Sequence, residues 1–344
     1  MFERIFKLSE HKTTVKTEVM AGITTFMTMA YILAVNPSVL GSTGMDTTAV
    51  LLATALASCL GTLCMAFMAN LPFALSAGMG LNAFMAYTVV AGYGYSWQVA
   101  LLAVFIEGLI FIVLSLTNVR EAIFNAIPLT LKKGVSVGIG LFIAFIGLQN
   151  SGLCVDSATL VGIISFPENF HTAGICALLT LIGLFFTAVF YTRKMKGAIL
   201  YGILLTWILG MLCQVTGLYV PTPDAGFYSL FPSWGMTDFS KLGLTFGQCF
   251  NVDFSAVGIV NFIVVIFSFL FVDIFDTLGT LIGVATKAKM LDKDGKLPGI
   301  KPALLADSIA TSAGAILGTS TTTTFVESAS GVAVGGRTGL TALV

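Results

Sequence analysis

The sequence predicts an all-α polytopic membrane protein, on the evidence of its composition, its ten apolar segments and the placement of its basic residues. Hydrophobic residues fill 56% of the 344 positions and charged residues only 10%, and the mean hydropathy is +0.96. These values lie far from those of soluble domains. A helix that crosses a bilayer needs about 20 apolar residues. On that template the expected spans are 19–40, 48–70, 73–91, 97–117, 132–150, 172–192, 197–217, 257–286, 302–318 and 325–342.

Lysine and arginine residues are distributed unequally between the two sides of these spans. Of the 17, all but Lys241 fall in the N-terminal segment, in alternate loops after it, or near the end of the tenth span, where Arg337 lies. Cytoplasmic segments of membrane proteins carry such an excess of positive charge. The loop residues concerned are Arg120, Lys132, Lys133, Arg193, Lys194, Lys196, Lys287, Lys289, Lys293, Lys296 and Lys301. We therefore expect a multi-pass protein of the cell membrane with a cytoplasmic N-terminus, which lacks the short apolar core of a cleavable signal peptide.

The titratable residues argue against a soluble enzyme, a metal site and a nucleic-acid partner. The formal net charge is zero, so no basic surface for nucleic acid is expected. His11 and His171 lie outside the apolar segments, and the six cysteines include no CxxC pair. We therefore expect no metal, no cofactor and no disulfide.

The stretch from Gly318 to Gly339, GTSTTTTFVESASGVAVGGRTG, does not fit an ordinary lipid-facing helix. The β-branched run Thr321–Thr324 favours extended backbone, whereas Phe325–Val334 returns to small and apolar residues that suit a closely packed helix. We predict a strand-like break followed by a half-helix. Such a break is tolerated at membrane depth only where protein or a water-filled cavity satisfies its backbone. A ligand site is therefore expected here, with a polar loop as the alternative.

The third span, LPFALSAGMGLNAFMAY, repeats this pattern. Ser76, Gly78 and Gly80 permit irregular or closely approached backbone, and the Asn82 amide can donate and accept hydrogen bonds side by side. GMGLNA is not a dinucleotide-binding fingerprint, because it lacks the third glycine and the strand–turn–helix context. Asn82 is therefore a candidate ligand residue, with a tie between two helices as the alternative.

A long non-spanning loop divides the chain. Residues 218–256, which contain Pro, Trp, Tyr and Phe, suit an extracytoplasmic position at the membrane interface. They separate seven spans in residues 1–217 from a second set in residues 257–344. The interrupted spans three and ten are each the third of their set, a pattern typical of inverted repeats. We predict a 7+7 inverted repeat, of which the second repeat is incomplete because the sequence ends after span ten.

Five acidic residues lie within spans or at their edges, where an ionisable group costs roughly 2.5–3.5 kcal/mol and marks a functional site by default. They are Glu107, Asp273, Asp276, Asp307 and Glu327. Asp273 and Asp276 are three residues apart and share one helical face. Glu327 belongs to the first turn of the predicted half-helix, whose N-terminus favours the ionised carboxylate, while desolvation and neighbouring carboxylates favour protonation. Asp273, Asp276 and Glu327 are therefore the candidates for proton exchange.

The other two acids receive weaker assignments. Glu107 is alone in its span, and an interhelical role and a proton-path role are equally supported. Asp307 lies near Lys301 at the cytoplasmic end of span nine, so a local structural role is expected for it.

A pseudo-symmetry between the repeats would bring span one into the site. Superposing Asn82 on Glu327, an offset of 245 positions, pairs the two acids of span eight with Thr28 and Tyr31 in span one. Thr28 is therefore expected to line the same cavity, although a threonine in a membrane helix often bonds only its own helix backbone.

The quoted motifs resemble those of the second nucleobase/cation symporter family, in its AzgA-like branch of adenine, guanine and hypoxanthine permeases. The resemblance runs from FKLSEHKTTVKTEVMAGITTFMTMAYILAVNP through SAGMGLNAF and FVDIFDTLGTLIGVA to ADSIATSAGAILGTSTTTTFVESASGVAVGGRTGLTA, and covers the whole sequence. It implies a fourteen-span fold of two inverted repeats, divided into a core and a gate domain, with short antiparallel strands in spans 3 and 10. The family's gate domain includes spans twelve to fourteen, which lie beyond this sequence.

The resemblance also implies a function and a site. The expected activity is uptake of a purine nucleobase by proton symport, through alternating access between the core and gate domains. The expected partners are a purine nucleobase, protons and the lipid bilayer, with a homodimer left open. The predicted substrate-binding residues are Gly80, Asn82, Asp273, Asp276, Glu327, Thr28 and Thr324.

Other functions fit the same residues less well. A uracil or xanthine permease of the same fold is the nearest alternative, and an anion transporter is disfavoured because no basic residue accompanies the acids at the midplane. A channel needs a continuous polar pore, whereas the polar residues concentrate in spans one, three, eight and ten. An enzyme needs a nucleophile with a base, or a set of metal ligands, and the histidine and cysteine positions supply neither.

Overall fold

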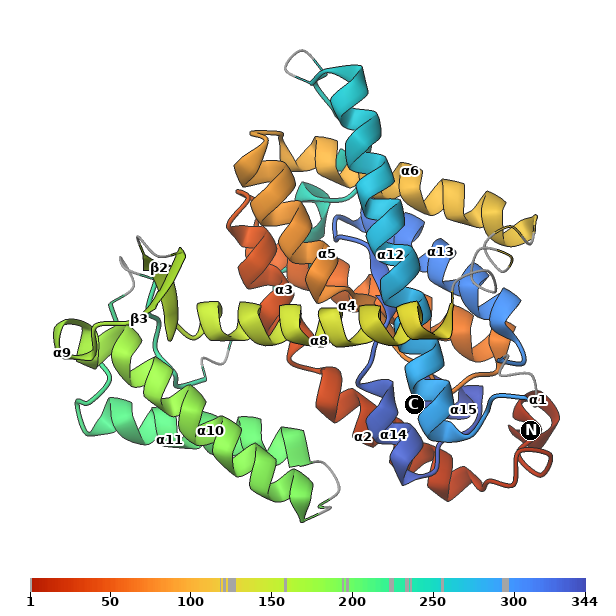
Figure 1. The fold of residues 1–344 in the computed structure, drawn as a ribbon, viewed down its shortest axis with the longest axis horizontal. Coiled ribbons are helices and arrows are strands. Elements are labelled where there is room, and N and C mark those ends of the chain that lie inside the picture. The colour runs from red at the N-terminus through yellow and green to blue at the C-terminus, as the bar shows by residue number, and fades with distance from the viewer. Residues whose placement is uncertain are drawn as a thin grey trace. The chain divides into compact units, whose positions relative to one another are not determined.

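The structure is a computed structural model. Long apolar helices make up most of it (Figure 1). It describes residues 2–117, 119, 122, 128–157, 160–193, 195, 198–222, 226–232, 235, 237–254, 257–292 and 297–344. Within these residues, two shorter apolar helices, Met79–Gly92 and Tyr201–Val215, accompany six helical segments that are long and apolar enough to cross a membrane. The six are Val15–Gly41, Thr47–Ala69, Trp97–Leu116, Phe166–Thr192, Ile259–Ala288 and Ile300–Leu317. The protein is therefore a helical, multi-pass membrane protein.

The chain divides into two compact units, Met1–Ile139 with Thr237–Val344, and Gly140–Met236. The helices and strands of the first unit are α1 (Phe2–Phe6), α2 (Val15–Met29), α3 (Ile32–Gly41), α4 (Thr47–Cys64), η1 (Met65–Ala69), β1 (Leu75–Ala77), α5 (Met79–Ala83), η2 (Phe84–Gly92), α6 (Trp97–Leu116), η5 (Phe239–Leu244), η6 (Gln248–Phe250), α12 (Ile259–Ala288), α13 (Ile300–Leu317), β4 (Thr322–Thr324), α14 (Ser328–Val334) and α15 (Gly339–Leu343). Helix α8 (Leu129–Asn150) leads from the first unit into the second. The second unit continues with β2 (Cys154–Ser157), β3 (Leu160–Ile163), α9 (Phe166–Asn169), η3 (Phe170–Gly174), α10 (Ile175–Thr192) and α11 (Ala198–Val215).

Helix α13 packs between α4 and α6 at the centre of the first unit. Small residues allow the close approach that membrane helices use for packing. A methyl group on Gly61 of α4 would lie 2.6 Å from Ala310 Cβ, and one on Gly108 of α6 would lie 2.8 Å from Ser312 N. Helix α12 crosses α6 and packs against it as well (Figure 1). The glycines thus bring the polar face of α13 to the middle of the unit.

Helices α4 and α6 begin where polar side chains cap their first turns. The Asp46 carboxylate accepts a hydrogen bond of 2.9 Å from Ala49 N, and Ser96 accepts one from Val99 N. Lys241, in η5, donates to Asp46 Oδ2 over 3.2 Å. The Ala49 amide, and then Lys241, hold the pKa of Asp46 below its usual value. The loops before α4 and before α12 therefore meet at one end of the unit.

The second unit contains a helical hairpin, with α10 packed along α11 (Figure 1). Its contact is built from reciprocal glycine–threonine pairs, Gly183 with Thr206 and Gly202 with Thr187. Each threonine hydroxyl donates to a glycine carbonyl one turn earlier in its own helix, over 2.7 Å. The hydroxyls are thereby satisfied without water, as a membrane interior requires.

The structure refines several predicted spans. The predicted span 19–40 corresponds to the membrane-length segment Val15–Gly41, which consists of two helices, α2 and α3. The predicted span 325–342 contains two short helices, α14 and α15. Glu327 is the residue immediately before α14 instead of a member of its first turn. The predicted division into a first repeat (1–217), a connecting loop (218–256) and a second repeat (257–344) concerns the symmetry of the sequence. It stays a prediction. Arg120, Lys194, Lys196, Lys293 and Lys296, which the orientation prediction uses, lie outside the described residues, as do the side chains of Lys132 and Lys133.

The carboxylate of Glu18 is fully buried and joins the first turn of α2 to the chain around the start of α15. Its Oε1 accepts from Arg337 N at 2.9 Å, and its Oε2 accepts from the backbone amides and hydroxyls of Thr338 and Thr341 at 2.6–3.2 Å. One carboxylate thus satisfies five donors that water cannot reach, at a helix N-terminus that favours negative charge.

Replacing Glu18 by Gln is expected to lower the free energy of unfolding by about 3 kcal/mol, because an amide NH₂ would face donors that lose their acceptor. Thermal unfolding of the purified protein in detergent measures the effect. Glu10→Gln is the control: Glu10 forms an exposed pair with Lys7 over 3.4 Å, and such pairs contribute less than about 1 kcal/mol. Equal unfolding midpoints for the two variants would contradict the assignment.

Candidate functional site

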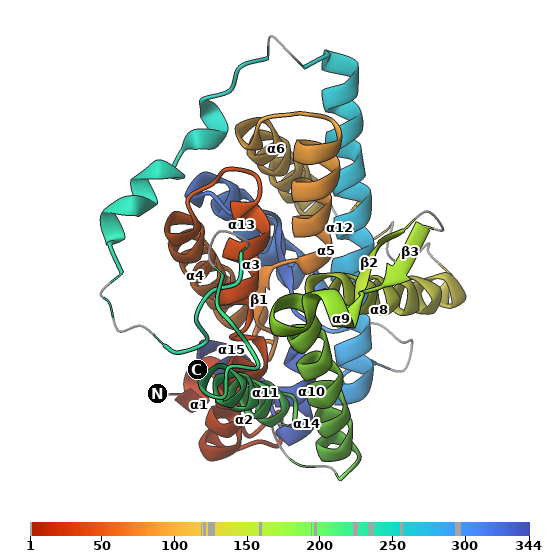
Figure 2. The ribbon, with the colours of Figure 1, turned by 90° about the vertical axis from the view of Figure 1, so that its left-hand side faces the viewer.

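Strands β1 and β4 form a two-stranded antiparallel sheet inside the first unit, beside α3 and α4 (Figure 2). Leu75 lies opposite Thr324, Ser76 opposite Thr323, and Ala77 opposite Thr322. The two stretches that the sequence singles out as irregular therefore lie side by side. Each strand is followed by a helix, α5 after β1 and α14 after β4, so two helix N-termini begin near the sheet.

Hydroxyl side chains of the flanking helices satisfy the outer edges of this sheet. The Thr62 hydroxyl accepts from Leu75 N at 3.0 Å and donates to Leu75 O at 3.2 Å. On the other side, the Thr311 hydroxyl donates to Thr322 O at 2.9 Å. Buried backbone groups must be paired within a membrane protein. The polar residues of α4 and α13 therefore explain how a two-stranded sheet persists in an apolar region.

The hydroxyl run before and within β4 connects the strand to four different helices. The contacts are Thr319 with Asn36 of α3, Ser320 with Asn82 of α5, Thr321 with Glu107 of α6, and Thr323 with Thr277 of α12. The Thr322 hydroxyl donates to Ser320 O over 3.5 Å. Thr324 is 2% exposed, and its Oγ1 has no hydrogen-bond partner among the described residues. An unpaired buried hydroxyl is costly, which suits a position that a ligand completes.

Thr277 of α12 joins two buried carboxyl groups. Its Oγ1 lies 3.1 Å from Asp273 Oδ1, 3.1 Å from Asp307 Oδ2 and 2.7 Å from Thr323 Oγ1. A hydroxyl has one hydrogen, so Thr277 donates in one contact at most. Thr323 can donate in a second contact. Thr277 either shares its hydrogen between the two acids or donates to one of them, and in the second case a proton on the other acid completes the third contact.

Asp276, about one turn after Asp273 on α12, faces the start of α5. A methyl group on Gly78 would lie 3.4 Å from Asp276 Oδ2, an ordinary contact, and 2.9 Å from Thr323 Cγ2, so the glycine makes room for Thr323. The described residues donate no hydrogen bond to the Asp276 carboxylate, which is half-buried. Its charge interacts with those of Asp307 and Glu327. Asp276 thus offers acceptor capacity at the end of β1. Gly80, the second residue of α5, is also half-buried.

Glu327 lies where β4 passes into α14 and contacts span one. Tyr31 Oη donates to Glu327 Oε1 over 2.6 Å, whereas Oε2 accepts no hydrogen bond from the described part of the chain. Thr28 lies close by: its hydroxyl is 2.8 Å from Ser330 Oγ and also bonds its own helix backbone. The structure therefore places Thr28 and Glu327 at the same contact between α2 and α14.

Asn82 is fully buried in a network of amides and hydroxyls. Its Nδ2 donates to Asn36 Oδ1 over 2.7 Å, and its Oδ1 accepts from Ser320. Asn36 in turn donates to Thr54 and Thr319 over 2.6 and 2.9 Å. Both ends of the Asn82 amide therefore form hydrogen bonds within the protein. This arrangement matches the alternative role predicted for Asn82, a tie between two helices. Direct contact of Asn82 with a ligand stays a prediction.

The expectation of a merely local role for Asp307 is wrong. Asp307 is fully buried and accepts from Thr324 N at 3.2 Å as well as from Thr277, whereas Lys301 is exposed. The sequence contains a signal for this placement. Asp307, Ser308, Thr311 and Ser312 form a polar stripe on one face of span nine, and a buried helix in a membrane turns such a face towards polar partners.

The pseudo-symmetry offset stays a prediction. In the antiparallel pairing of β1 with β4, Ser76 and Thr323 are 247 positions apart and Ala77 and Thr322 are 245 positions apart. The register alone therefore does not select one offset. Tyr31, which the sequence brought in only through the offset of 245, contacts Glu327.

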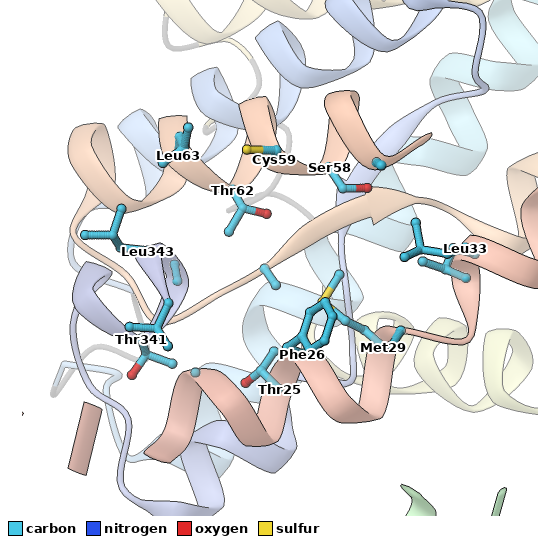
Figure 3. Close-up of a pocket in the computed structure, with 17 residues that line it drawn as sticks. Thr25, Phe26, Met29, Leu33, Ser58, Cys59, Thr62, Leu63, Thr341 and Leu343 are labelled. Atoms are coloured by element: carbon cyan, nitrogen blue, oxygen red, sulfur yellow. The ribbon is translucent and has the colours of Figure 1, made fainter. Parts of the chain in front are cut away.

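A cavity of about 300 Å³ lies beside the sheet, between α2, α4 and α15. Figure 3 shows Thr25, Phe26 and Met29 along one wall and Ser58, Cys59 and Thr62 along another, with Thr341 and Leu343 at one end. Asp273, Asp276 and Glu327 are not among its lining residues. The cavity therefore adjoins the outer edge of β1 and is separate from the carboxyl groups.

Among the described residues, no three His, Cys, Asp or Glu side chains are grouped as metal ligands.

Comparisons with known proteins agree with this architecture. A model described as a permease family matches residues 16–344. The adenine permease AdeP of Escherichia coli is 42% identical over 348 residues, which cover 100% of this chain and 72% of that protein. The guanine/hypoxanthine permease PbuO of Bacillus subtilis is 45% identical over 345 residues, covering 98% and 74%. The transmembrane domain of a cyanobacterium bicarbonate transporter, BicA, is similar in structure, with a TM-score of 0.60 and 16% identity over 95% of this chain and 78% of that chain.

Proposed function

Because the chain belongs to the permease family, among the nucleobase/cation symporters, we propose that it takes up adenine, guanine or hypoxanthine across the cell membrane. The observation that carries the substrate class is the group of free polar atoms at the sheet: the Asp276 carboxylate, Glu327 Oε2 and the Thr324 hydroxyl. The relatives AdeP and PbuO are named for adenine and for guanine and hypoxanthine.

The chemistry of a purine matches these atoms. A neutral purine presents ring and exocyclic N–H donors beside nitrogen and oxygen acceptors. Two carboxylates accept from the donors, and the Thr324 hydroxyl and the first amides of α5 serve the acceptors. Such a site excludes molecules that leave its buried groups unpaired. Gly80, Asp276, Glu327 and Thr324 then contact the purine, whereas Asp273 and Asn82 support them from α12 and α5.

Proton coupling is assigned to the acids around Thr277. The hydrogen count at Thr277 supports one proton on Asp273 or Asp307. Loss of that proton leaves two carboxylates around one hydroxyl and weakens the contact that holds β4 to α12. Because β4 carries Thr324 and leads to Glu327, the proton and the purine act on the same strand.

We assign alternating access to the two compact units. The first, with spans one to four and eight to ten, serves as the core, and the second, with spans six and seven, belongs to the gate. The antiparallel pairing of β1 with β4 supports the inverted repeat. The N-terminus is assigned to the cytoplasm from the placement of basic residues.

Competition uptake tests the substrate class. The full-length protein is produced in cells that lack their own nucleobase uptake, and uptake of labelled adenine, guanine, hypoxanthine, xanthine and uracil is measured. Unlabelled adenine, guanine, hypoxanthine, xanthine and uracil are then added in large excess. We expect at least one of the first three to be taken up and uracil not to compete. Uptake of uracil or xanthine without adenine, guanine or hypoxanthine would contradict the proposal.

A further inference from the structure

Tyr31 stands at the break in span one, between the end of α2 at Met29 and the start of α3 at Ile32. Its backbone carbonyl accepts from Ala34 N and Val35 N over 3.0 Å, so the chain returns to a helix at once. Its ring packs in a small apolar cluster with Phe325 and Met79. The break therefore places a phenol beside the starts of both half-helices that follow the sheet.

The phenol hydroxyl makes a short hydrogen bond. Tyr31 Oη donates to Glu327 Oε1 over 2.6 Å, a distance typical of an O–H donor on an ionised carboxylate. One turn earlier, the Thr28 hydroxyl lies 2.8 Å from Ser330 Oγ. The Tyr31 contact holds Glu327 Oε1 and leaves Oε2 without a partner among the described residues, and the Thr28 contact ties α2 to α14 beside it.

We propose that Tyr31 is a positioning residue for purine binding: its hydroxyl holds the Glu327 carboxylate in one orientation, with Oε2 directed to the purine, and stabilises its ionised form. This inference rests on the proposed function. Among the described residues, the Asp276 carboxyl group on α12 interacts electrostatically with Glu327 and also with Asp307 on α13. Both are acidic and oppose a further negative charge. The phenol donor counteracts them.

Tyr31→Phe tests the inference, because it keeps the ring and removes only the donor. We expect the KM for the purine to rise about tenfold, as for a lost hydrogen bond to a charged group, with a maximum rate within about twofold of that of the unsubstituted protein. The acidic limb of the uptake–pH profile should move towards neutral pH, because the ionised carboxylate loses a stabilising donor. Equilibrium binding of labelled purine to the purified full-length variant measures the same change without transport.

Tyr87→Phe is the matched control, since Tyr87 is 48% exposed and its hydroxyl forms no hydrogen bond with the described residues. Thermal unfolding establishes that both variants fold. An unchanged KM and pH profile in Tyr31→Phe, or a lower maximum rate alone, would overturn the positioning role. Absence of purine binding by the unsubstituted protein would instead overturn the proposed function, so the two failures are distinguishable.

Discussion

Glu327→Gln is expected to reduce purine uptake by about 100-fold, which corresponds to a loss of roughly 3 kcal/mol of binding free energy for the purine. The carboxylate is the acceptor for Tyr31 and, in the proposed site, for a purine N–H. An amide of the same shape places an NH₂ group against one of these donors and removes the charge. Initial rates of uptake of labelled purine, normalised to the amount of protein in the membrane, measure the effect.

Glu168→Gln is the control for this prediction, because Glu168 is an exposed glutamate in the short helix α9 of the second unit. It should leave uptake within about twofold of the unsubstituted rate, as surface substitutions usually do. Asp273→Asn is measured in parallel. Full, pH-dependent uptake by both Glu327→Gln and Asp273→Asn would exclude these carboxyl groups from substrate binding and proton coupling.

Thr277→Val is expected to reduce proton-coupled uptake by about 100-fold, because disruption of a buried charged network costs roughly 3 kcal/mol or more. Valine has nearly the same shape as threonine but leaves Asp273, Asp307 and Thr323 without their shared hydroxyl. Thr277→Ser restores the hydroxyl and should retain most of the activity. Purine-driven proton movement in proteoliposomes, followed with a pH-sensitive dye, measures coupling beside uptake.

Thr286→Val supplies the comparison within the same helix, since Thr286 is exposed near the end of α12. We expect it to transport and couple like the unsubstituted protein. If purine-driven proton movement in Thr277→Val equalled that in Thr286→Val, the coupling proton would not lie on the acids that contact Thr277.

The irregular stretches were predictable from sequence because their local chemistry conflicts with a lipid-facing helix. A run of β-branched residues with hydroxyl groups favours extended backbone and must be buried in protein. That reasoning located Thr322–Thr324 and the SAGMG segment, and the structure contains strands at both. It also identified Asp273, Asp276 and Glu327, since an acid in an apolar segment is costly wherever its partners lie.

The partners of these residues could not be predicted in the same way, because they come from helices distant in the sequence. Thr277 contacts Asp307 of α13 and Thr323 of β4, and Glu327 contacts Tyr31. Such contacts depend on the register of β1 against β4 and on the glycines that bring α13 close to its neighbours.

Equilibrium binding of labelled purine to the purified full-length protein tests the central claim most directly, because it separates the site from transport and coupling. We expect saturable binding that adenine, guanine or hypoxanthine displaces, that Glu327→Gln weakens about 100-fold and that Glu168→Gln leaves unchanged. Binding of equal strength in Glu327→Gln would show that the purine does not use the carboxylate at the end of β4, and would contradict the site described for this protein.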